Sequence, residues 1–404
     1  MKKALSFMML ATLLLTVACK KPKDNYTVII SLDGNRWDYV EYYDTPFFDS
    51  LATVGVSARM EPSYPASTFP NHYTLATGLV PDHTGLVNNS YWDSGRQYTY
   101  SMGDKECRYD PYYYGGEPIW VTAQKQGVLT GNVYWVGSDI PIKDTYPTYY
   151  RVWDEDPHWT FEERVDEIVR LMSLPQDQRP RLVMGYFDEP DHNGHVYGPI
   201  SAETKDIVEQ MDSLMHALYL RLKALPYGDK INFIVLSDHG MTEISDQRFI
   251  NWNDVVPMEW VDHIVAKTPT SIFVKEGYVD SLYNRISQVE HLTVWKHGEV
   301  PEELNYGTSD RLGDLIVAPD LGWQFGTSPA SGFGAHGYSP KDLDMMVMFR
   351  AVGPDFKVGY EAPFTEGEQS AFRNVDIYPL LCELLGIKAE PTDGQLERIK
   401  KILK

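Results

Sequence analysis

Three short motifs combine histidine with carboxylates or glycines at spacings that suit metal binding. In "DHNGH", Asp191 and His195 are four residues apart. In "SDHG", Asp238 and His239 are adjacent, and in "GAHG" two glycines frame His336. Glycine lets the backbone turn tightly and bring the imidazole close to a ligand. Carboxylate oxygens and imidazole nitrogens are donors that zinc binds well, so these motifs indicate a metal site.

A fourth motif, "PSYPASTFPNHYT" at residues 62–74, carries a Ser67-Thr68 pair between prolines. Proline interrupts helices and central strands, so we expect a rigid turn here. Pro65 and Pro70 would hold the Thr68 hydroxyl in place before a substrate arrives. A threonine hydroxyl is a weak nucleophile and needs a neighbouring group, such as a metal ion, that removes its proton.

Together the motifs supply enough ligands for two metal ions. The candidates are Asp33, Asp191, His195, Asp238, His239, His336 and the hydroxyl of Thr68. Two metal ions about 4 Å apart clamp the attacking and departing oxygens in displacement at phosphorus. Each motif alone is explained as readily by a surface turn or a helix cap, but their joint occurrence favours a metal centre.

The elements that must position these residues are apolar runs typical of buried parallel strands. The runs "YTVIISLDG" (26–34), "RLVMGYFDEPD" (181–191) and "INFIVLSDHG" (231–240) each become acidic at the carboxyl end. Helical periodicity marks residues 161–172 and 203–225. Strands that alternate with helices predict an α/β fold with a mostly parallel sheet flanked by helices. Such sheets bind ligands at the carboxyl ends of their strands, where we expect the acidic ends to meet.

The chain is expected to contain one catalytic domain, residues 26–390. Within it, residues 245–330 are less regular and predict a smaller cap or insertion. The segment "NVDIYPLLCELLGI" predicts a closing helix, and residues 391–404 are expected to form a C-terminal tail. Cys107 and Cys382 could pair in an oxidising compartment, and the sequence leaves this open.

The N-terminus and the charge balance bear on location and ligands. Residues 1–18 combine two lysines, a short apolar run and small residues before Cys19. This is the pattern of a signal peptide and is too short for a spanning helix. Since it resembles a bacterial lipoprotein signal, we expect an exported periplasmic or cell-surface lipoprotein, with residues 19–25 as a tether and its lipid as the only membrane contact. A formal net charge of −21 disfavours binding along nucleic-acid polymers.

The motifs in their order resemble the nucleotide pyrophosphatase/phosphodiesterase family of the alkaline phosphatase superfamily, also called type I phosphodiesterases. The matching segments are "YPASTFPNHYTLATGLVPDHTGLVNN", "DEPDHNGHVYGP", "LSDHGM" and "GAHGYSP". The resemblance extends over nearly all of the chain after the tether. It implies an alkaline-phosphatase-like core and two zinc ions.

The resemblance also implies a nucleophile and two ligand sets. Thr68 matches the family threonine that forms a phospho-threonine intermediate. One zinc would be held by Asp33, Asp238 and His239 with the Thr68 oxygen, and the second by Asp191, His195 and His336.

Three further residues are assigned to the substrate by the same resemblance. Asn89 matches an asparagine that donates to a phosphoryl oxygen, and Phe69 matches an aromatic residue that packs on the substrate. Tyr150 is expected to form the opposite wall, with Tyr149 or Trp153 as alternatives.

The favoured reaction is cleavage of a nucleotide-type phosphodiester or phosphoanhydride to release a nucleoside monophosphate. A phospholipid headgroup diester stays open, because an aromatic box also binds a quaternary ammonium. A phosphomonoesterase would need cationic groups near the nucleophile, and residues 60–95 contain no Lys or Arg. A sulfatase would need a Cys-x-Pro-x-Arg-like setting, which "STFPNH" lacks. A lipoprotein that binds glycans or proteins through Tyr and Trp is the non-enzymatic alternative, and the complete ligand set argues against it.

Overall fold

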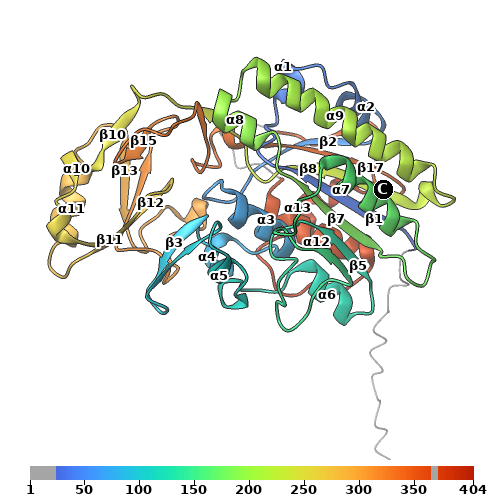
Figure 1. Cartoon of the computed structure of the whole chain (residues 1–404), viewed down its shortest axis with the longest axis horizontal. Coiled ribbons are helices and arrows are strands. Elements are labelled where there is room, and N and C mark those ends of the chain that lie inside the picture. The colour runs from blue at the N-terminus through green and yellow to red at the C-terminus, as the bar shows by residue number, and fades with distance from the viewer. Residues whose placement is uncertain (1–23, 365–371) are drawn as a thin grey trace, which may run out of the picture.

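The computed structural model describes residues 24–364 and 372–404, so the expected signal peptide and Cys19 lie outside the described residues (Figure 1). Its central element is an eight-stranded sheet. The strands lie side by side in the order β18 (Tyr360–Glu361), β2 (Val56–Met60), β17 (Val347–Val352), β8 (Ile231–Leu236), β1 (Tyr26–Leu32), β7 (Leu182–Phe187), β5 (Thr130–Val133) and β6 (Tyr149–Arg151).

The sheet is mostly parallel, which confirms the predicted fold class. β17 pairs antiparallel with β2 and β8, and the other five neighbouring pairs are parallel. The three apolar runs form β7, β1 and β8, which are neighbours and are buried along their whole length. The register aligns Leu32 with Phe187 and Ser31 with Leu236. The acidic segments after these strands therefore emerge at one edge, as expected.

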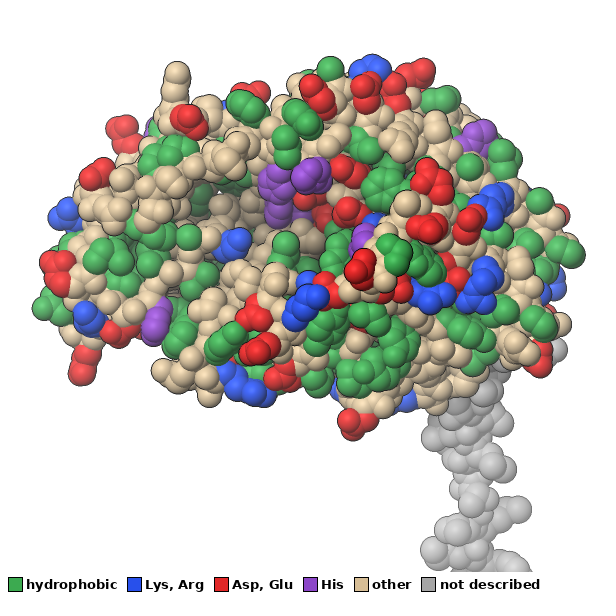
Figure 2. Space-filling view, in the orientation of Figure 1, with side chains coloured by type: hydrophobic (Ala, Val, Ile, Leu, Met, Phe, Trp, Pro, Cys, Tyr) green, Lys and Arg blue, Asp and Glu red, His purple; other side chains and the backbone are tan. Residues whose placement is uncertain are grey.

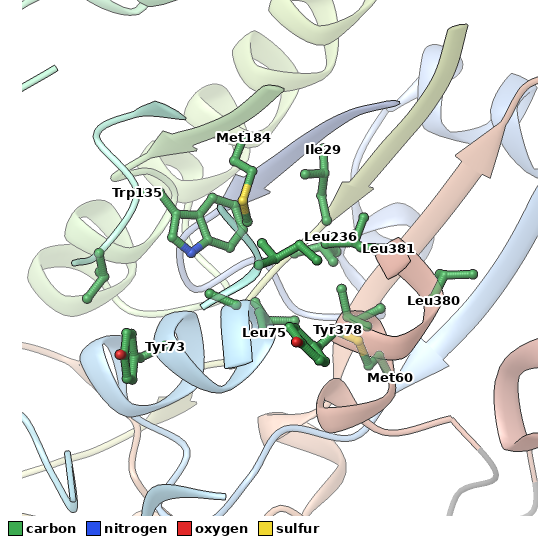
Figure 3. Packing of buried hydrophobic residues seen from close by; sticks show 14 of the residues in the cluster. Ile29, Met60, Tyr73, Leu75, Trp135, Met184, Leu236, Tyr378, Leu380 and Leu381 are labelled. Atoms are coloured by element: carbon green, nitrogen blue, oxygen red, sulfur yellow. The ribbon is translucent and has the colours of Figure 1, made fainter. Parts of the chain in front are cut away.

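Helices cover both faces of the sheet (Figure 1). Successive side chains of a strand point to opposite faces, so Ile29 and Ile30 of β1 belong to different hydrophobic cores. The core around Ile29 includes Trp135 and Leu381 (Figure 3). On that face lie α3 (Thr68–Thr77), α6 (Ile119–Lys125) and α12 (Ile377–Leu385), and on the other lie α2 (Pro46–Val54), α7 (Phe161–Met172) and α9 (Ala202–Lys223).

The helices predicted from sequence begin and end at recognisable caps. The Thr160 hydroxyl accepts from the N–H of Glu163, whose carboxylate accepts in return from the N–H of Thr160, so α7 begins with a capping box. The Ser201 hydroxyl caps α9. The predicted closing helix is α12, which ends at Gly386 with φ +66°, a conformation that favours glycine.

Residues 68–77 correct the expectation of a turn. They form helix α3, and Ser67 lies just before it in extended conformation. Pro70 falls in the first turn, where N–H groups have no intrahelical acceptor, so its missing N–H does not interrupt the helix. The Asn71 amide donates to the carbonyls of Pro65 and Ser67 at 2.8 and 2.9 Å. Thr68 is therefore the first residue of a helix.

A second sheet forms within residues 245–330 and is called the small sheet below. It is antiparallel, and helix α11 (Val279–Ile286) packs on it around a separate core that includes Ile272, Leu282 and Leu315. It lies to the left of the central sheet in Figure 1. Its strands, in order, are β11 (Val261–Val265), β12 (Thr270–Val274), β14 (Leu315–Pro319) and β13 (Leu292–Lys296).

Smaller elements complete the described chain. The two-stranded pairs are β3 (Ser90–Asp93) with β4 (Tyr98–Ser101), β10 (Phe249–Asn251) with β15 (Gln324–Gly326), and β9 (Thr242–Glu243) with β16 (Gly334–Ala335). The short helices are α1 (Tyr39–Tyr42), α4 (Pro81–Thr84), α5 (Lys105–Arg108), α8 (Asp191–Tyr197), α10 (Trp252–Val255) and α13 (Leu396–Ile399).

The structure describes the C-terminal segment and the two cysteines of the catalytic domain. Residues 391–404 pack on the domain, because Ile399 and Ile402 bury their side chains in the core around Ile29. Cys107 and Cys382 are both buried free thiols and do not pair. Among the helices of residues 24–364 and 372–404, none has the length and apolarity needed to cross a bilayer.

Candidate active site and metal centre

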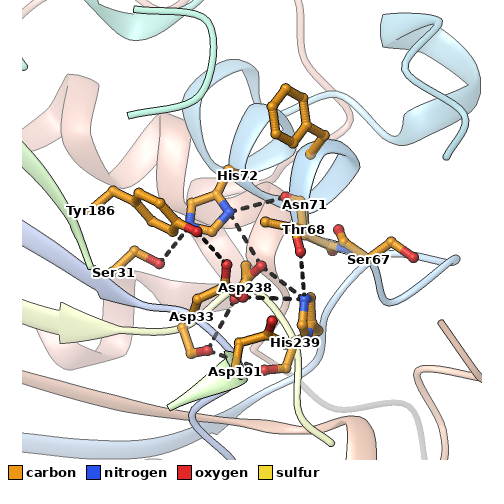
Figure 4. Close-up of polar contacts among 12 residues, drawn as sticks. Ser31, Asp33, Ser67, Thr68, Asn71, His72, Tyr186, Asp191, Asp238 and His239 are labelled. Atoms are coloured by element: carbon orange, nitrogen blue, oxygen red, sulfur yellow. Dashed lines mark hydrogen bonds and ion pairs between the residues drawn. The ribbon is translucent and has the colours of Figure 1, made fainter. Parts of the chain in front are cut away.

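Loops from three neighbouring strands meet at the carboxyl edge of the central sheet (Figure 4). Asp33 follows β1, Asp238 follows β8, and Asp191 begins α8 shortly after β7. The Asp191 N–H donates to the Asp33 carbonyl at 3.0 Å, and the Gly34 N–H donates to Asp238 Oδ1 at 3.3 Å. These bonds join segments that are far apart in the sequence and hold three carboxylates together.

The first group of candidate ligands contains Asp33, Asp238 and His239. The Nε2 atom of His239 lies 3.3 Å from Asp33 Oδ1 and 3.2 Å from Asp238 Oδ2. One ligand atom from each of the three residues lies within 4.8 Å of the others. All three side chains are buried, so this group is closed to bulk solvent.

The second group expected from the sequence contains Asp191, His195 and His336. Among the described residues, ligand atoms of Asp191, His336 and His239 lie within 4.8 Å of one another, and His195 lies beside them. Asp191 Oδ1 lies 3.5 Å from His195 Nε2, one helical turn later, and 3.8 Å from His336 Nε2. The rings of His336 and His239 stack with their centroids 3.7 Å apart. The two groups therefore adjoin, as two ions a few ångströms apart would require.

The imidazoles of His195, His239 and His336 are oriented in the same way. In each of them Nδ1 faces a backbone carbonyl, so we assign the ring proton to Nδ1. The bonds join His239 to Gly240 (2.9 Å), His195 to Gly334 (2.8 Å) and His336 to Ala66 (2.9 Å). This leaves each Nε2 lone pair directed at the carboxylates, which is how protein scaffolds orient metal-binding histidines.

Charge at the centre is uncompensated. Among the described residues, Asp33 Oδ1, Asp191 Oδ1 and Asp238 Oδ2 accept no hydrogen bond. Burial, followed by the charges of Asp238 and Asp191, raises the pKa of Asp33 well above its usual value. Buried carboxylates are costly without a compensating positive charge. Oxygen and nitrogen donors in one buried group and one partly exposed group fit divalent cations such as zinc.

Neighbouring imidazoles shift the pKa values of Asp238 and His336. Burial favours the neutral form of Asp238, but the His239 and His72 rings outweigh burial and hold the pKa of Asp238 below its usual range. Burial, then the neighbouring His239 and His195 rings, lowers the pKa of His336 well below its usual value. His336 is therefore neutral, the form in which imidazole binds a metal.

Thr68 lies beside the first group. Its hydroxyl donates to His239 Nε2 at 3.0 Å (Figure 4). Asn89 is held next to it, because Asn89 Oδ1 accepts from the Phe69 N–H at 2.9 Å. The start of α3 therefore brings Thr68, Phe69 and Asn89 to the edge where the carboxylates meet.

Two residues that the sequence interpretation missed orient the carboxylates. The Tyr186 hydroxyl donates to Asp33 Oδ2 at 2.6 Å. His72 is fully buried, with Nδ1 3.2 Å from Asp238 Oδ2 and Nε2 2.9 Å from Ser31 Oγ. The four-residue spacing from Thr68 to His72 is the signal that a helical interpretation of this segment would have used. Tyr186 has no such signal, because it sits inside an apolar strand.

Two cavities meet at Thr68, Asp191 and His195, and Figure 2 shows a hollow in which histidine and acidic side chains gather. The first cavity, about 360 Å³, combines aromatic side chains with carboxylates and Arg108. The second, about 550 Å³, is bounded by Asn89, by His336 and by residues of the small sheet and β15. The aromatic side chains of the first cavity are Phe69, Tyr114, Tyr134, Trp135, Trp153 and Tyr186.

Tyr150 does not reach either cavity. It lies on β6, the edge strand of the sheet, is 38% exposed, and stacks on Tyr146 with ring centroids 4.8 Å apart. Because side chains alternate along a strand, Tyr149 points back to the core around Ile30 instead. Trp153, beyond the end of β6, lines the first cavity.

Comparison with known proteins identifies the family of the chain. The family model described as type I phosphodiesterase / nucleotide pyrophosphatase matches residues 27–339. Human ectonucleotide pyrophosphatase/phosphodiesterase family member 1 is 33% identical over 94% of the chain, which spans 42% of that protein. Human family member 5 is 31% identical over 98% of the chain, which spans 82% of it. Venom phosphodiesterase CdcPDE of Crotalus durissus collilineatus is 32% identical over 93% of the chain, which spans 46% of it.

Solved structures give the same relationship. An inactive threonine-to-alanine variant of murine family member 5, in complex with AMP, superimposes with a TM-score of 0.87 at 31% identity, covering 94% of this chain and 100% of that one. Human family member 5 gives a TM-score of 0.86 at 31% identity, with the same coverage. The chain therefore belongs to the type I phosphodiesterase / nucleotide pyrophosphatase family.

Proposed function

We propose that the chain is an exported hydrolase that cleaves phosphodiester or phosphoanhydride bonds of nucleotide-type substrates and releases a nucleoside monophosphate. One observation carries the proposal: the Thr68 hydroxyl lies 3.0 Å from His239 Nε2, beside two adjoining ligand groups and at the junction of two cavities. A diester has two substituents on phosphorus, and two cavities that meet at one hydroxyl can receive one each.

Zinc is the metal that the donor set favours. Asp33, Asp238 and His239 would hold one ion with the Thr68 oxygen, and Asp191, His195 and His336 would hold the other. When bound, the ions would favour the ionised Thr68 hydroxyl and neutralise charge on the phosphoryl and departing oxygens. The three carboxylate oxygens that accept no hydrogen bond within the described chain support this loading.

The residues of the chain have separate tasks in the proposed reaction. Thr68 Oγ forms a bond to phosphorus while the bond to the leaving oxygen breaks, which leaves a phospho-threonine ester. The departing oxygen keeps the electron pair of the broken bond. Asn89, fixed through Phe69, donates from its amide to a phosphoryl oxygen. A water molecule then cleaves the ester, which restores the Thr68 hydroxyl and frees the monophosphate.

The first cavity favours a nucleobase as the retained group. Phe69 and Trp153 present flat aromatic surfaces there, and bases stack on such surfaces without regard to sequence. The murine relative in complex with AMP supports the same choice. A choline headgroup is the competing ligand, because aromatic rings also bind a quaternary ammonium.

Localisation as a lipoprotein anchored at Cys19 belongs to this proposal and concerns a residue outside the described part of the chain.

The decisive experiment compares Thr68→Ala with Thr68→Ser on ATP, on the p-nitrophenyl ester of thymidine monophosphate, and on a choline lysophospholipid. We expect Thr68→Ala to lose at least about a thousandfold in turnover, because the hydroxyl proposed to form the covalent ester is removed. Thr68→Ser should keep measurable activity, and acid-quenched protein should carry a phosphorylated residue 68. Unchanged turnover by Thr68→Ala would contradict the proposal, and preference for the lysophospholipid would replace the nucleotide by a lipid headgroup.

A further inference from the structure

The second cavity differs from the first in the origin and chemistry of its walls. Beside Asn89 and His336, it is lined by the turn between β11 and β12 and by the loop after β15, including Thr327 and Ser328. Lys267, in that turn, is the only Lys or Arg among its described lining residues. The only carboxylate among these described lining residues is Asp191, which lies beside His195 and His336.

The turn that carries Lys267 is fastened to the catalytic edge on two sides. The Asn88 amide donates to the Thr268 carbonyl at 3.3 Å, and Asn88 Oδ1 accepts from the Asn89 N–H at 2.8 Å. On the other side, Gly337 follows His336 with φ +97°, and a Cβ on it would lie 2.5 Å from the Thr268 oxygen. Only glycine permits this approach. The turn is thereby held between the phosphoryl-binding asparagine and a candidate metal ligand.

The turn is also internally ordered. The Lys267 N–H donates to the Val265 carbonyl at 3.0 Å, and the Thr270 hydroxyl donates to the Lys267 carbonyl at 2.9 Å. The backbone that carries the ammonium is therefore fixed. The residue keeps solvent-exposed surface in the open cavity, while the protein around its ammonium partly desolvates it.

The ammonium of Lys267 is available for an anionic ligand. Within residues 24–364 and 372–404, no carboxylate forms an ion pair with it, although the chain carries a net charge of −21. The surrounding protein lowers the pKa of Lys267 by partial burial. A lysine that is partly desolvated and faces no carboxylate gains more from an anion than a fully solvated one.

We propose that Lys267 binds an anionic leaving group and makes the second cavity selective for substrates whose leaving group carries phosphate. This inference rests on the proposed function, with the nucleoside in the first cavity. For a nucleoside triphosphate, Thr68 Oγ bonds to the α-phosphorus, the bond to the bridging oxygen breaks, and pyrophosphate departs with that electron pair. Lys267 contacts the phosphate of the departing group and no part of the retained monophosphate.

The test compares two nucleotide substrates that differ in the leaving group. ATP releases pyrophosphate, whereas the p-nitrophenyl ester of thymidine monophosphate releases a phenolate without phosphate. We expect Lys267→Gln to lower kcat/KM for ATP by about ten- to a hundredfold, the range for a hydrogen bond to a charged group. The effect on the aryl ester should stay below about twofold, and Lys267→Arg should keep most of the ATP activity.

Lys275→Gln is the matched control. It removes the same charge from the same small sheet, but its ammonium donates to the Glu259 carbonyl and it lies outside both cavities. Both substrates should be cleaved by this variant as by the unmodified chain. Equal losses on both substrates in Lys267→Gln, or no loss on ATP, would overturn the role of Lys267 and leave the proposed function standing. Failure of the unmodified zinc-loaded chain to cleave either substrate would overturn the proposed function itself.

Discussion

The carboxyl edge of the central sheet and the small sheet contribute to the same hollow in opposite ways. At the edge, Asp238 and His239 are fully buried, and hydrogen bonds tie the loops after β1, β7 and β8 to one another. The small sheet has its own hydrophobic core and reaches the hollow only through a turn and a loop, from which Lys267 projects into open space.

This difference separates two requirements of the proposed chemistry. Groups that hold a metal or a nucleophile must keep their positions to a fraction of an ångström, which a rigid sheet edge provides. Groups that select a substituent of the substrate need only complementary charge or shape, and loops on a separate unit can vary without disturbing the edge. The first cavity is therefore formed around the central sheet, whereas part of the second cavity's lining comes from the small sheet.

Removal of metal should abolish the chemistry at the carboxyl edge and leave the fold of both sheets intact. We expect treatment with a strong chelator to lower phosphodiesterase activity at least about a hundredfold, with recovery on addition of zinc, because metal ions supply most of the charge stabilisation. The far-UV circular dichroism should stay unchanged, since the hydrophobic cores of both sheets do not involve the ligands. Full activity in protein whose metal content has fallen far below one ion per chain, measured by elemental analysis, would contradict a metal mechanism.

Trp153→Ala should weaken binding in the first cavity while every candidate metal ligand and Thr68 stay in place. Loss of one aromatic surface costs about 1–3 kcal/mol in base stacking, so KM for the thymidine ester should rise about tenfold with kcat little changed. Bis(p-nitrophenyl) phosphate, which has no base, should show a smaller loss.

Tyr150→Ala is the matched variant for that experiment. Its ring stacks on Tyr146 at the edge strand and lines neither cavity. We expect changes below about twofold on both substrates. A loss in Tyr150→Ala that equals the loss in Trp153→Ala would show that the cavity wall extends to β6.

The smallest expected effect is on folding stability at the border between the two regions. There Asp342 and Asp320 line a third cavity together with residues of the small sheet. Burial, then the charges of Asp344 and Asp320, raises the pKa of Asp342 to about 6. Because this pKa is higher in the folded than in the unfolded chain, folding is favoured most below pH 4 and loses stability as the pH rises through about 6.

Asp342→Asn should remove that loss. At pH 7.5 we expect the variant to be about 1 kcal/mol more stable than the unmodified chain, after allowance for solvent screening of a partly exposed group. The gain should shrink towards pH 4.5, where the aspartate is protonated. Thermal unfolding at both pH values measures this, and a gain that does not depend on pH would point to a change in packing instead.

The local sequence pattern was sufficient to predict a helix or strand where one periodicity dominated the segment. The buried runs became β1, β7 and β8, and the periodic segments 161–172 and 203–225 became α7 and α9 within a residue or two. The predicted closing segment, 374–387, contains α12 at Ile377–Leu385. It failed at residues 68–77, because the position of Pro70 relative to the helix start decides whether proline interrupts a helix. It also did not place Tyr150, which was expected opposite Phe69 and lines neither cavity. The neighbouring strand decides which face of an edge strand is turned towards a cavity, and the local sequence does not contain that information.

By itself, the sequence determined the fold class, the family, and the candidate residues for metal binding and attack on phosphorus, because these depend on residue type and local spacing. Only the tertiary structure decided that Asp33, Asp191 and Asp238 share one edge, that His72 and Tyr186 hold them, and that Lys267 faces the same hollow. Those contacts join residues up to about two hundred positions apart. The order of strands in the sheet and the packing of the small sheet set them, and no local pattern encodes either.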